Sequence, residues 1–203
     1  MNLYFSPGAC SMVPHLILEE LELKYEAVPV NLKDHTYAGG DFYTVNPKGY
    51  VPTLELDTKQ ILTENIAILN YLADLKPEAK LLPSSGMDRY RHLETLTFIT
   101  TELHKSFGPI FNDKTTEEDK QLYREHLKKR FKIIETQLEG KNFLMGATYS
   151  LPDAYLFVMT RWAKAKKVDI NDYPNLLKHF ETVGARPATK RVIELELSNK
   201  AKK

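Results

Sequence analysis

The stretch Asn2-Leu3-Tyr4-Phe5-Ser6-Pro7-Gly8-Ala9-Cys10-Ser11 determines how we interpret this chain. Residues 2–5 predict a short strand, residues 6–9 a turn, and Ser11 the start of a helix. Cys10, the only cysteine of 203 residues, therefore falls beside the first N–H groups of that helix. Backbone donors and the positive end of the helix dipole favour a thiolate there. For this residue taken alone, a buried thiol acting as a small hydrophobe is the alternative.

Further signals occur in a recognisable order across the first 80 residues. Three more strands are predicted, at residues 26–30, 53–56 and 60–62. The polar turn Asp57-Thr58-Lys59 joins the last two as a hairpin, and a second helix begins near Glu64. Strand, helix, strand, hairpin and helix is the order of a thioredoxin-like α/β domain.

The remainder of the chain shows only helical periodicity. Helices are predicted near residues 87–111, 117–138, 152–167, 174–184 and 187–198. We therefore expect a thioredoxin-like domain at 1–80, a linker at 81–86 and an all-helical domain at 87–203.

Composition excludes several classes of partner. Lys plus Arg total 28 against 27 Asp plus Glu, which favours neither nucleic acid nor an anionic membrane. The start lacks the pattern of a signal peptide, and no stretch approaches the roughly 18 apolar residues of a membrane span. A lone cysteine suits a reducing compartment, so we expect a cytoplasmic protein.

The stretch Asn46-Pro47-Lys48-Gly49-Tyr50-Val51-Pro52-Thr53-Leu54 is the second signal. A proline at the entry of a strand leaves an unpaired backbone edge beside it. In this position, before a hairpin strand and opposite a thiol loop, we predict a cis Val51-Pro52 bond, although trans is the general rule. The Val51 backbone would then pair with an extended peptide ligand.

The third signal is Leu62-Thr63-Glu64-Asn65-Ile66. A helix that starts here offers N–H groups to a carboxylate, Asn65 adds a side-chain donor, and the Glu64 carboxylate accepts an ammonium group. The alternative is a plain cap by Thr63, with Glu64 complementing the helix dipole.

A polar stripe on the first helix after residue 87 is the fourth signal. It contains Thr97, Thr101, His104 and Lys105, and an apolar stripe lies opposite, formed by Leu96, Ile99, Leu103 and Phe107. Such a stripe is usually solvated; next to Cys10, its positive charge would favour the thiolate.

A capping box at Ser150-Leu151-Pro152-Asp153 has a structural role, and its removal should cost roughly 1 kcal/mol or more. The nucleotide-binding glycine motifs, H-E-x-x-H and C-x-x-C are absent from the sequence, so neither a nucleotide nor a metal is expected. Any redox chemistry must use a single thiol.

These pieces together resemble the cytosolic glutathione transferases, specifically the bacterial beta class. The resemblance is carried by Ser6-Pro7-Gly8-Ala9-Cys10-Ser11, Val45-Asn46-Pro47-Lys48-Gly49 with Val51-Pro52, Leu62-Thr63-Glu64, Tyr71-Leu72-Ala73-Asp74, Glu102-Leu103-His104-Lys105 and Asp153-Ala154-Tyr155-Leu156-Phe157. It implies a thioredoxin-like domain that binds glutathione, a helical domain that supplies most of the second-substrate pocket, and a homodimer.

The resemblance also implies roles for single residues. Cys10 would face the glutathione sulfur, and the Val51 backbone, beside Pro52, would pair with the cysteinyl unit. The remaining ligand-binding positions would be Lys33 at the glycyl carboxylate, Glu64 and Asn65 at the γ-glutamyl end, and Tyr50, Thr97, His104 and Lys105 around the site, with His104 counted as catalytic. Four positions depart from the class pattern, namely Phe5, Tyr50, Asn65 and Thr97.

The predicted function is that of a glutathione transferase in redox chemistry and detoxification. Either the Cys10 thiolate exchanges with a disulfide through a mixed disulfide with glutathione, or it only hydrogen-bonds glutathione while that thiol attacks a small electrophile. Two rivals remain: a non-enzymatic adaptor resembling the RNA-polymerase-binding stringent starvation proteins, and a ligand-sequestering protein.

Overall fold

Strand β1 (Asn2–Phe5) is an inner strand of a six-stranded sheet with the order β4-β3-β2-β1-β5-β6. The structure is a computed structural model that describes residues 1–200. One neighbour of β1, β2 (Glu26–Asn31), runs parallel to it; the other, β5 (Thr53–Glu55), runs antiparallel and forms the predicted hairpin with β6 (Ile61–Thr63). Two short strands, β3 (Thr36–Tyr37) and β4 (Gly40–Asp41), extend the other edge. The four predicted strands are confirmed to within a residue or two.

Both faces of β1 are covered, which explains its apolar sequence. Leu3 and Phe5 are fully buried, and the Phe5 ring packs against His15 with ring centroids 5.2 Å apart. On the opposite face Tyr4 packs against Phe42, with centroids 5.6 Å apart. Alternate side chains of a strand point to opposite faces, so both layers depend on this one strand.

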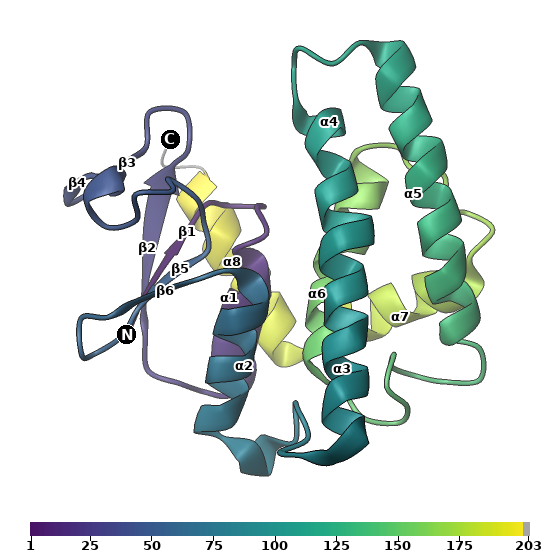
Figure 1. Ribbon diagram of the computed structural model, residues 1–203, viewed down its shortest axis with the longest axis horizontal. Coiled ribbons are helices and arrows are strands. Elements are labelled where there is room, and N and C mark those ends of the chain that lie inside the picture. Colours follow the sequence, from purple (N-terminus) through teal and green to yellow (C-terminus); the bar gives the residue numbers. More distant parts are fainter. Residues whose placement is uncertain (201–203) are drawn as a thin grey trace. The chain divides into compact units, whose positions relative to one another are not determined.

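Three helices belong to the same unit as the sheet (Figure 1). They are α1 (Met12–Glu20), α2 (Asn65–Leu75) and α8 (Pro187–Lys200), and α1 contacts the other two. Residues 1–80 and 186–200 thus form one compact unit, and residues 81–185 form another. The last helix was expected in the helical domain at 87–203, whereas its contacts with α1 place it in the unit of the sheet. The assignment of separate functions to residues 1–80 and 87–203 stays a prediction.

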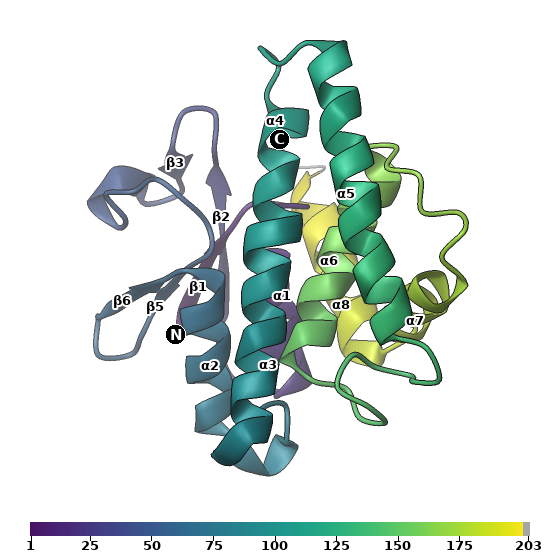
Figure 2. The same ribbon diagram turned by 45° about the vertical axis from the view of Figure 1, so that its right-hand side comes forward.

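The second unit consists of helices (Figure 2). Its members are α3 (Gly86–Phe98), α4 (Gly108–Phe111), α5 (Glu117–Gln137), α6 (Leu151–Ala165) and α7 (Pro174–Gly184), with α6 the most deeply buried. Leu81 and Leu82, expected in a linker, are buried, and the Leu81 carbonyl accepts a hydrogen bond from the Leu151 N–H at 3.1 Å. The start of this unit is therefore packed rather than exposed.

The single helix predicted over residues 87–111 is interrupted. A π-helical segment (Ile99–His104) and a 3₁₀ turn (Lys105–Phe107) separate α3 from α4. Hydroxyl groups along it donate to the carbonyl four residues earlier, for example Thr100 to Leu96 at 2.9 Å, and such bonds compete with the helical ladder. Pro109 also lacks the N–H that would continue the ladder.

Candidate functional site

The loop that carries Cys10 is held by a buried serine. Ser11, fully buried at the N-cap of α1, accepts the Ser6 N–H at its hydroxyl oxygen (3.1 Å) and lies 3.3 Å from the Ser6 carbonyl, to which it donates. Gly8 has φ +79°, a conformation that L side chains rarely adopt. The predicted strand, turn and helix start are confirmed here, and they fix the backbone of the thiol.

A carboxylate of α8 also holds this loop. Glu196, only 5% exposed, accepts the Gly8 N–H at 2.8 Å, and its other oxygen lies 3.3 Å from Nδ1 of the fully buried His15. Neither side chain was predicted to contact the thiol loop. The available signal was that Glu196 stands four residues after Val192, on the buried face of α8.

The thiol and the proline motif lie together, as predicted. The Cys10 Sγ donates to the Val51 carbonyl at 3.3 Å, and the Val51-Pro52 bond is cis. A carbonyl acceptor favours the protonated thiol over the thiolate. The N–H groups of Met12 and Val13 donate to the carbonyls of Ala9 and Cys10, so these two donors of the helix start serve the backbone.

Buried polar side chains shape the turn before Pro52. Asn46, 2% exposed, donates to the Tyr50 carbonyl (2.9 Å) and to the Thr53 hydroxyl (3.0 Å), and that hydroxyl donates to the same carbonyl. Asn46 and Thr53 were quoted in the sequence motif without a role. Each supplies the other with a hydrogen-bond partner, and both hold the segment of chain that enters β5.

Glu64 has an unusual backbone conformation. It is the N-cap of α2 with φ +72°, a region sparsely populated by residues other than glycine and enriched at functional sites. The alternative of a plain cap by Thr63 is wrong, because no side chain caps α2 and the Thr63 hydroxyl accepts from Lys48 Nζ at 3.0 Å. Lys48 Nζ also lies 3.0 Å from a Glu64 carboxylate oxygen. Lys48 had been quoted in the motif without a role.

The start of α2 offers backbone donors. The first intrahelical bond runs from the Ile68 N–H to the Glu64 carbonyl, so the N–H groups of residues 65–67 precede it. The Asn65 side chain is 7% exposed, and its oxygen has no hydrogen-bond partner among the described residues. The predicted side-chain donor is therefore mostly buried, whereas the Glu64 side chain is 72% exposed.

Lys33 and Tyr50 lie at the surface of this unit. Lys33 follows β2, its side chain is exposed, and its N–H donates to the Asn31 side chain at 3.1 Å. Tyr50 is 69% exposed and directly precedes the cis bond. Their functional assignments remain predictions.

The second unit contains the other three predicted site residues. Thr97 and Lys105 are exposed, and the Thr97 hydroxyl donates to the Leu93 carbonyl at 2.8 Å. His104 differs from Thr97, Thr101 and Lys105 of the polar stripe, because it is half-buried and its Nδ1 lies 2.6 Å from the Tyr155 hydroxyl. The apolar stripe opposite is confirmed as fully buried, at Leu96, Ile99, Leu103 and Phe107.

A cluster of aromatic rings adjoins His104 through Trp162. The Trp162 indole packs edge-on against the imidazole, with centroids 5.2 Å apart, and against Phe111 at 4.8 Å and Phe107 at 5.5 Å. Phe107 is fully buried and Phe111 is 42% exposed. Of these rings, Phe107 thus belongs to the core, and Phe111 presents apolar surface to solvent.

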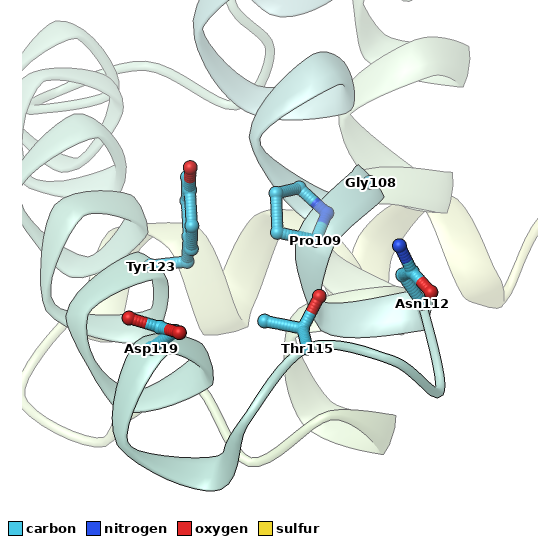
Figure 3. Close-up of a pocket in the computed structure, with 6 residues that line it drawn as sticks. All are labelled: Gly108, Pro109, Asn112, Thr115, Asp119 and Tyr123. Carbon is cyan, nitrogen blue, oxygen red and sulfur yellow. The ribbon is translucent and has the colours of Figure 1, made fainter.

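A shallow hollow of about 660 Å³ opens at one end of the helical unit. Figure 3 shows Asp119 and Tyr123 of α5 on one side, Pro109 and Asn112 on the other, and Thr115 between them. The predicted site residues do not line it. Among residues 1–200, no group of three or more His, Cys, Asp or Glu is arranged to hold a metal ion. The helices of the same residues include none with the length and hydropathy of a membrane span.

Comparison with known families identifies both parts of the chain. Residues 1–74 match the family model of the glutathione S-transferase N-terminal domain, and residues 98–187 match that of the C-terminal domain. Glutathione S-transferase GstA of Escherichia coli O157:H7 is 37% identical over 198 residues, covering 97% of this chain and 98% of the relative.

Solved structures agree along the same length. A sphingomonad glutathione S-transferase in complex with glutathione is 40% identical with a TM-score of 0.93, over 97% of this chain and 98% of the other. The beta-class glutathione S-transferase of Sphingomonas chungbukensis is 39% identical, with the same TM-score and coverage.

Proposed function

Because the chain belongs to the glutathione S-transferase family, in its beta class, we propose that it binds glutathione with the ligand sulfur beside Cys10. The observation that carries this proposal is the 3.3 Å contact between the Cys10 thiol and the Val51 carbonyl, next to the cis proline. A thiol and an edge suited to an extended peptide lie within one hydrogen bond of each other. Glutathione is a short peptide with a thiol of its own.

Binding would change the partner of the thiol. The cysteinyl N–H of glutathione would donate to the Val51 carbonyl, which accepts from the Cys10 thiol in this structure. A carbonyl that accepts from the peptide holds the thiol proton less firmly, so peptide binding favours loss of that proton. By linkage, ionisation of Cys10 would favour peptide binding equally.

The γ-glutamyl end of glutathione fits the start of α2. Its carboxylate would accept from the N–H groups of residues 65–67, and its ammonium would pair with Glu64, whose side chain is 72% exposed. Lys48 already occupies one oxygen of Glu64, at 3.0 Å, so the ammonium shares or displaces that partner. For Asn65 we propose that the backbone, rather than the mostly buried side chain, takes part.

The remaining positions receive roles by charge and exposure. Lys33 would pair with the glycyl carboxylate, and the exposed Tyr50 would cover the cysteinyl unit beside Pro52. From the helical unit, His104 would be catalytic, Lys105 would supply positive charge, and Thr97 would offer a hydroxyl.

Two reactions are compatible with this arrangement. In thiol-disulfide exchange, the Cys10 thiolate attacks a mixed disulfide of glutathione, forms Cys10–S–S–glutathione and expels the other thiolate; a second glutathione thiolate then releases oxidised glutathione and regenerates Cys10. In conjugation, the glutathione thiolate attacks an electrophilic carbon and displaces its leaving group, while Cys10 stays a hydrogen-bonding partner. Neither reaction requires a metal or a nucleotide.

Intact-mass spectrometry distinguishes the two modes. After incubation with oxidised glutathione, exchange predicts one added glutathionyl group per chain, removed by a reductant and absent in Cys10→Ala. Conjugation without exchange predicts no adduct, but turnover of an aryl halide that Cys10→Ala lowers only in part. Full exchange activity in Cys10→Ala would overturn the role given to Cys10.

Retention on immobilised glutathione tests the ligand itself, with Glu64→Gln as the variant of weakened binding. An adaptor would show no binding to reduced or oxidised glutathione, and a sequestering protein would bind without turnover. We place the reaction in the cytoplasm, where glutathione is kept reduced and a lone thiol remains available.

We further propose that the chain acts as a homodimer. Met87 and Tyr90 lie three residues apart on α3 and are 66% and 65% exposed, a pairing of large apolar side chains that suits burial against a second copy. Light scattering should give twice the chain mass of 23.4 kDa, and Tyr90→Glu should reduce it toward one chain. A single-chain mass for the unaltered protein would overturn this assignment.

A further inference from the structure

His104 is held from two sides by helix α6. Its Nδ1 lies 2.6 Å from the hydroxyl of Tyr155, which is fully buried, and the indole of Trp162, seven residues further along α6, packs against the ring. Seven residues are about two turns, so both contacts come from one face of the helix. The imidazole therefore has a fixed orientation in the helical unit.

His104 is the last residue of the π-helical segment, and its ring faces α6. A regular helix over residues 87–111 would put His104 on the same stripe as Thr97, Thr101 and Lys105. Those three side chains are exposed, whereas His104, the last residue of the π-helical segment, is half-buried. Such π-helical turns are frequent at functional sites.

The chemistry of the two groups determines where the proton lies. A tyrosine hydroxyl, with an ordinary pKa near 10, is a good donor and a poor acceptor beside a neutral imidazole. When it donates to Nδ1, the single proton of the neutral ring is on Nε2. We propose that Tyr155 is a positioning residue that holds His104 as the Nε2–H tautomer.

This inference rests on the proposed function, and it sharpens the role of His104. An imidazole with its proton on Nε2, and with Nδ1 engaged by Tyr155, donates a hydrogen bond from Nε2 and does not act as a general base there. His104 then stabilises negative charge that develops on sulfur or on a leaving group, through an N–H held in place before the reaction.

The direct test is the protonation of the His104 ring nitrogens in the full chain. Long-range ¹H–¹⁵N spectra at pH 8, above the ordinary histidine pKa of about 6.5, distinguish a protonated nitrogen from an acceptor. The chain has six histidines, and His104→Gln assigns the signals. We expect an acceptor-type Nδ1 and a protonated Nε2 in the unaltered protein, and a mixture of tautomers in Tyr155→Phe.

Tyr173→Phe is the matched control, because Tyr173 is also buried and its hydroxyl donates to a backbone carbonyl, that of Lys128, at 3.0 Å. Both variants lose a hydroxyl that makes a hydrogen bond, but only Tyr155→Phe should change the tautomer of His104. It should also lower kcat about 3- to 10-fold, with the KM for glutathione nearly unchanged.

A proton on Nδ1 in the unaltered protein would overturn the proposal, and that spectrum remains decisive even if Tyr155→Phe fails to fold. A Tyr155→Phe variant with unchanged tautomer and kcat would overturn it as well. Failure of the proposed function looks different: His104→Gln would keep full activity, whatever the tautomer.

Discussion

Replacing Glu196 tests whether the last helix holds the thiol loop. Its carboxylate accepts the Gly8 N–H at 2.8 Å and lies 3.3 Å from His15 Nδ1, with 5% of Glu196 exposed. A hydrogen bond to a charged group contributes about 1.5–3 kcal/mol, and the longer contact falls below that range. We expect Glu196→Ala to lower the free energy of unfolding by about 2–4 kcal/mol, and Glu196→Gln, which keeps an acceptor, by less.

The same variant should alter the reactivity of the thiol. At about 2–4 °C per kcal/mol for a chain of this size, Glu196→Ala should lower the Tm by roughly 4–16 °C. Because Cys10 is the only thiol, the rate of alkylation by iodoacetamide reports the loop directly. We expect that rate to change, together with the rate of thiol-disulfide exchange, since the Gly8 N–H loses the carboxylate that accepts its hydrogen bond.

Glu194→Ala provides the control on the same helix. Glu194 is exposed, so its removal should change stability by no more than about 0.5 kcal/mol and leave alkylation unaltered. Equal Tm values and equal alkylation rates for Glu196→Ala and Glu194→Ala would refute the role of Glu196 in holding the loop. A stability loss without any change in alkylation would leave the bond structural and refute its role in holding the thiol.

Three other substitutions probe separate parts of the chain. Asp153→Ala removes a fully buried carboxylate that accepts hydrogen bonds from Ser150, Leu144 and His179, so chemical denaturation should show a free energy of unfolding lower by about 3–5 kcal/mol. Thr116→Ala, which removes an exposed N-cap, should lower it by about 1 kcal/mol, and equal losses in the two variants would contradict this prediction. Lys48→Met removes the ammonium group that competes with the glutathione ammonium for the Glu64 carboxylate, so the KM for glutathione should fall by up to about 5-fold. Because the Lys48–Glu64 pair is exposed, the Tm should change little; a raised KM would refute the competition. Burial and the Glu55 carboxylate raise the pKa of Tyr4 to about 12, so the stability that the protonated Tyr4 hydroxyl contributes is complete below pH 10 and is lost as the pH rises toward 12. The difference between the absorbance titrations of the unaltered protein and Tyr4→Phe should show the ionisation of this hydroxyl near pH 12.

Local features of the fold were predictable because each rests on neighbouring residues. The turn before Cys10, the Asp57-Thr58-Lys59 hairpin and the Ser150–Asp153 capping box are all specified within a few positions. The cis bond before Pro52 was predictable from its place at a strand entry opposite the thiol. Helical periodicity identified the buried face of residues 87–111, but it could not show the π-helical segment, because the same apolar stripe also fits a regular helix.

Partners distant in sequence were not predictable in the same way. The sequence gives α8 an apolar face without saying which element that face meets, and its contact with α1 joins residues about 180 positions apart. Lys48 and Glu64 are closer, at 16 positions, yet their pairing depends on the turn that Asn46 and Thr53 hold. Such contacts are set by the tertiary fold and not by local pattern.

Even so, two of the missed contacts had a common signal. Glu196 stands on a helix face with Val192, and Tyr155 stands between Ala154 and Leu156 in a helix whose residues are nearly all apolar there. A buried polar group without a partner costs several kcal/mol, so a polar side chain on an apolar helix face requires a partner somewhere in the fold. The sequence thus indicates that a partner exists, and the structure identifies it: the thiol loop for Glu196, and His104 for Tyr155. The loop that carries Cys10 and the His104 side chain both have proposed roles in the reaction, so substitutions of Glu196 and Tyr155 test those roles most directly.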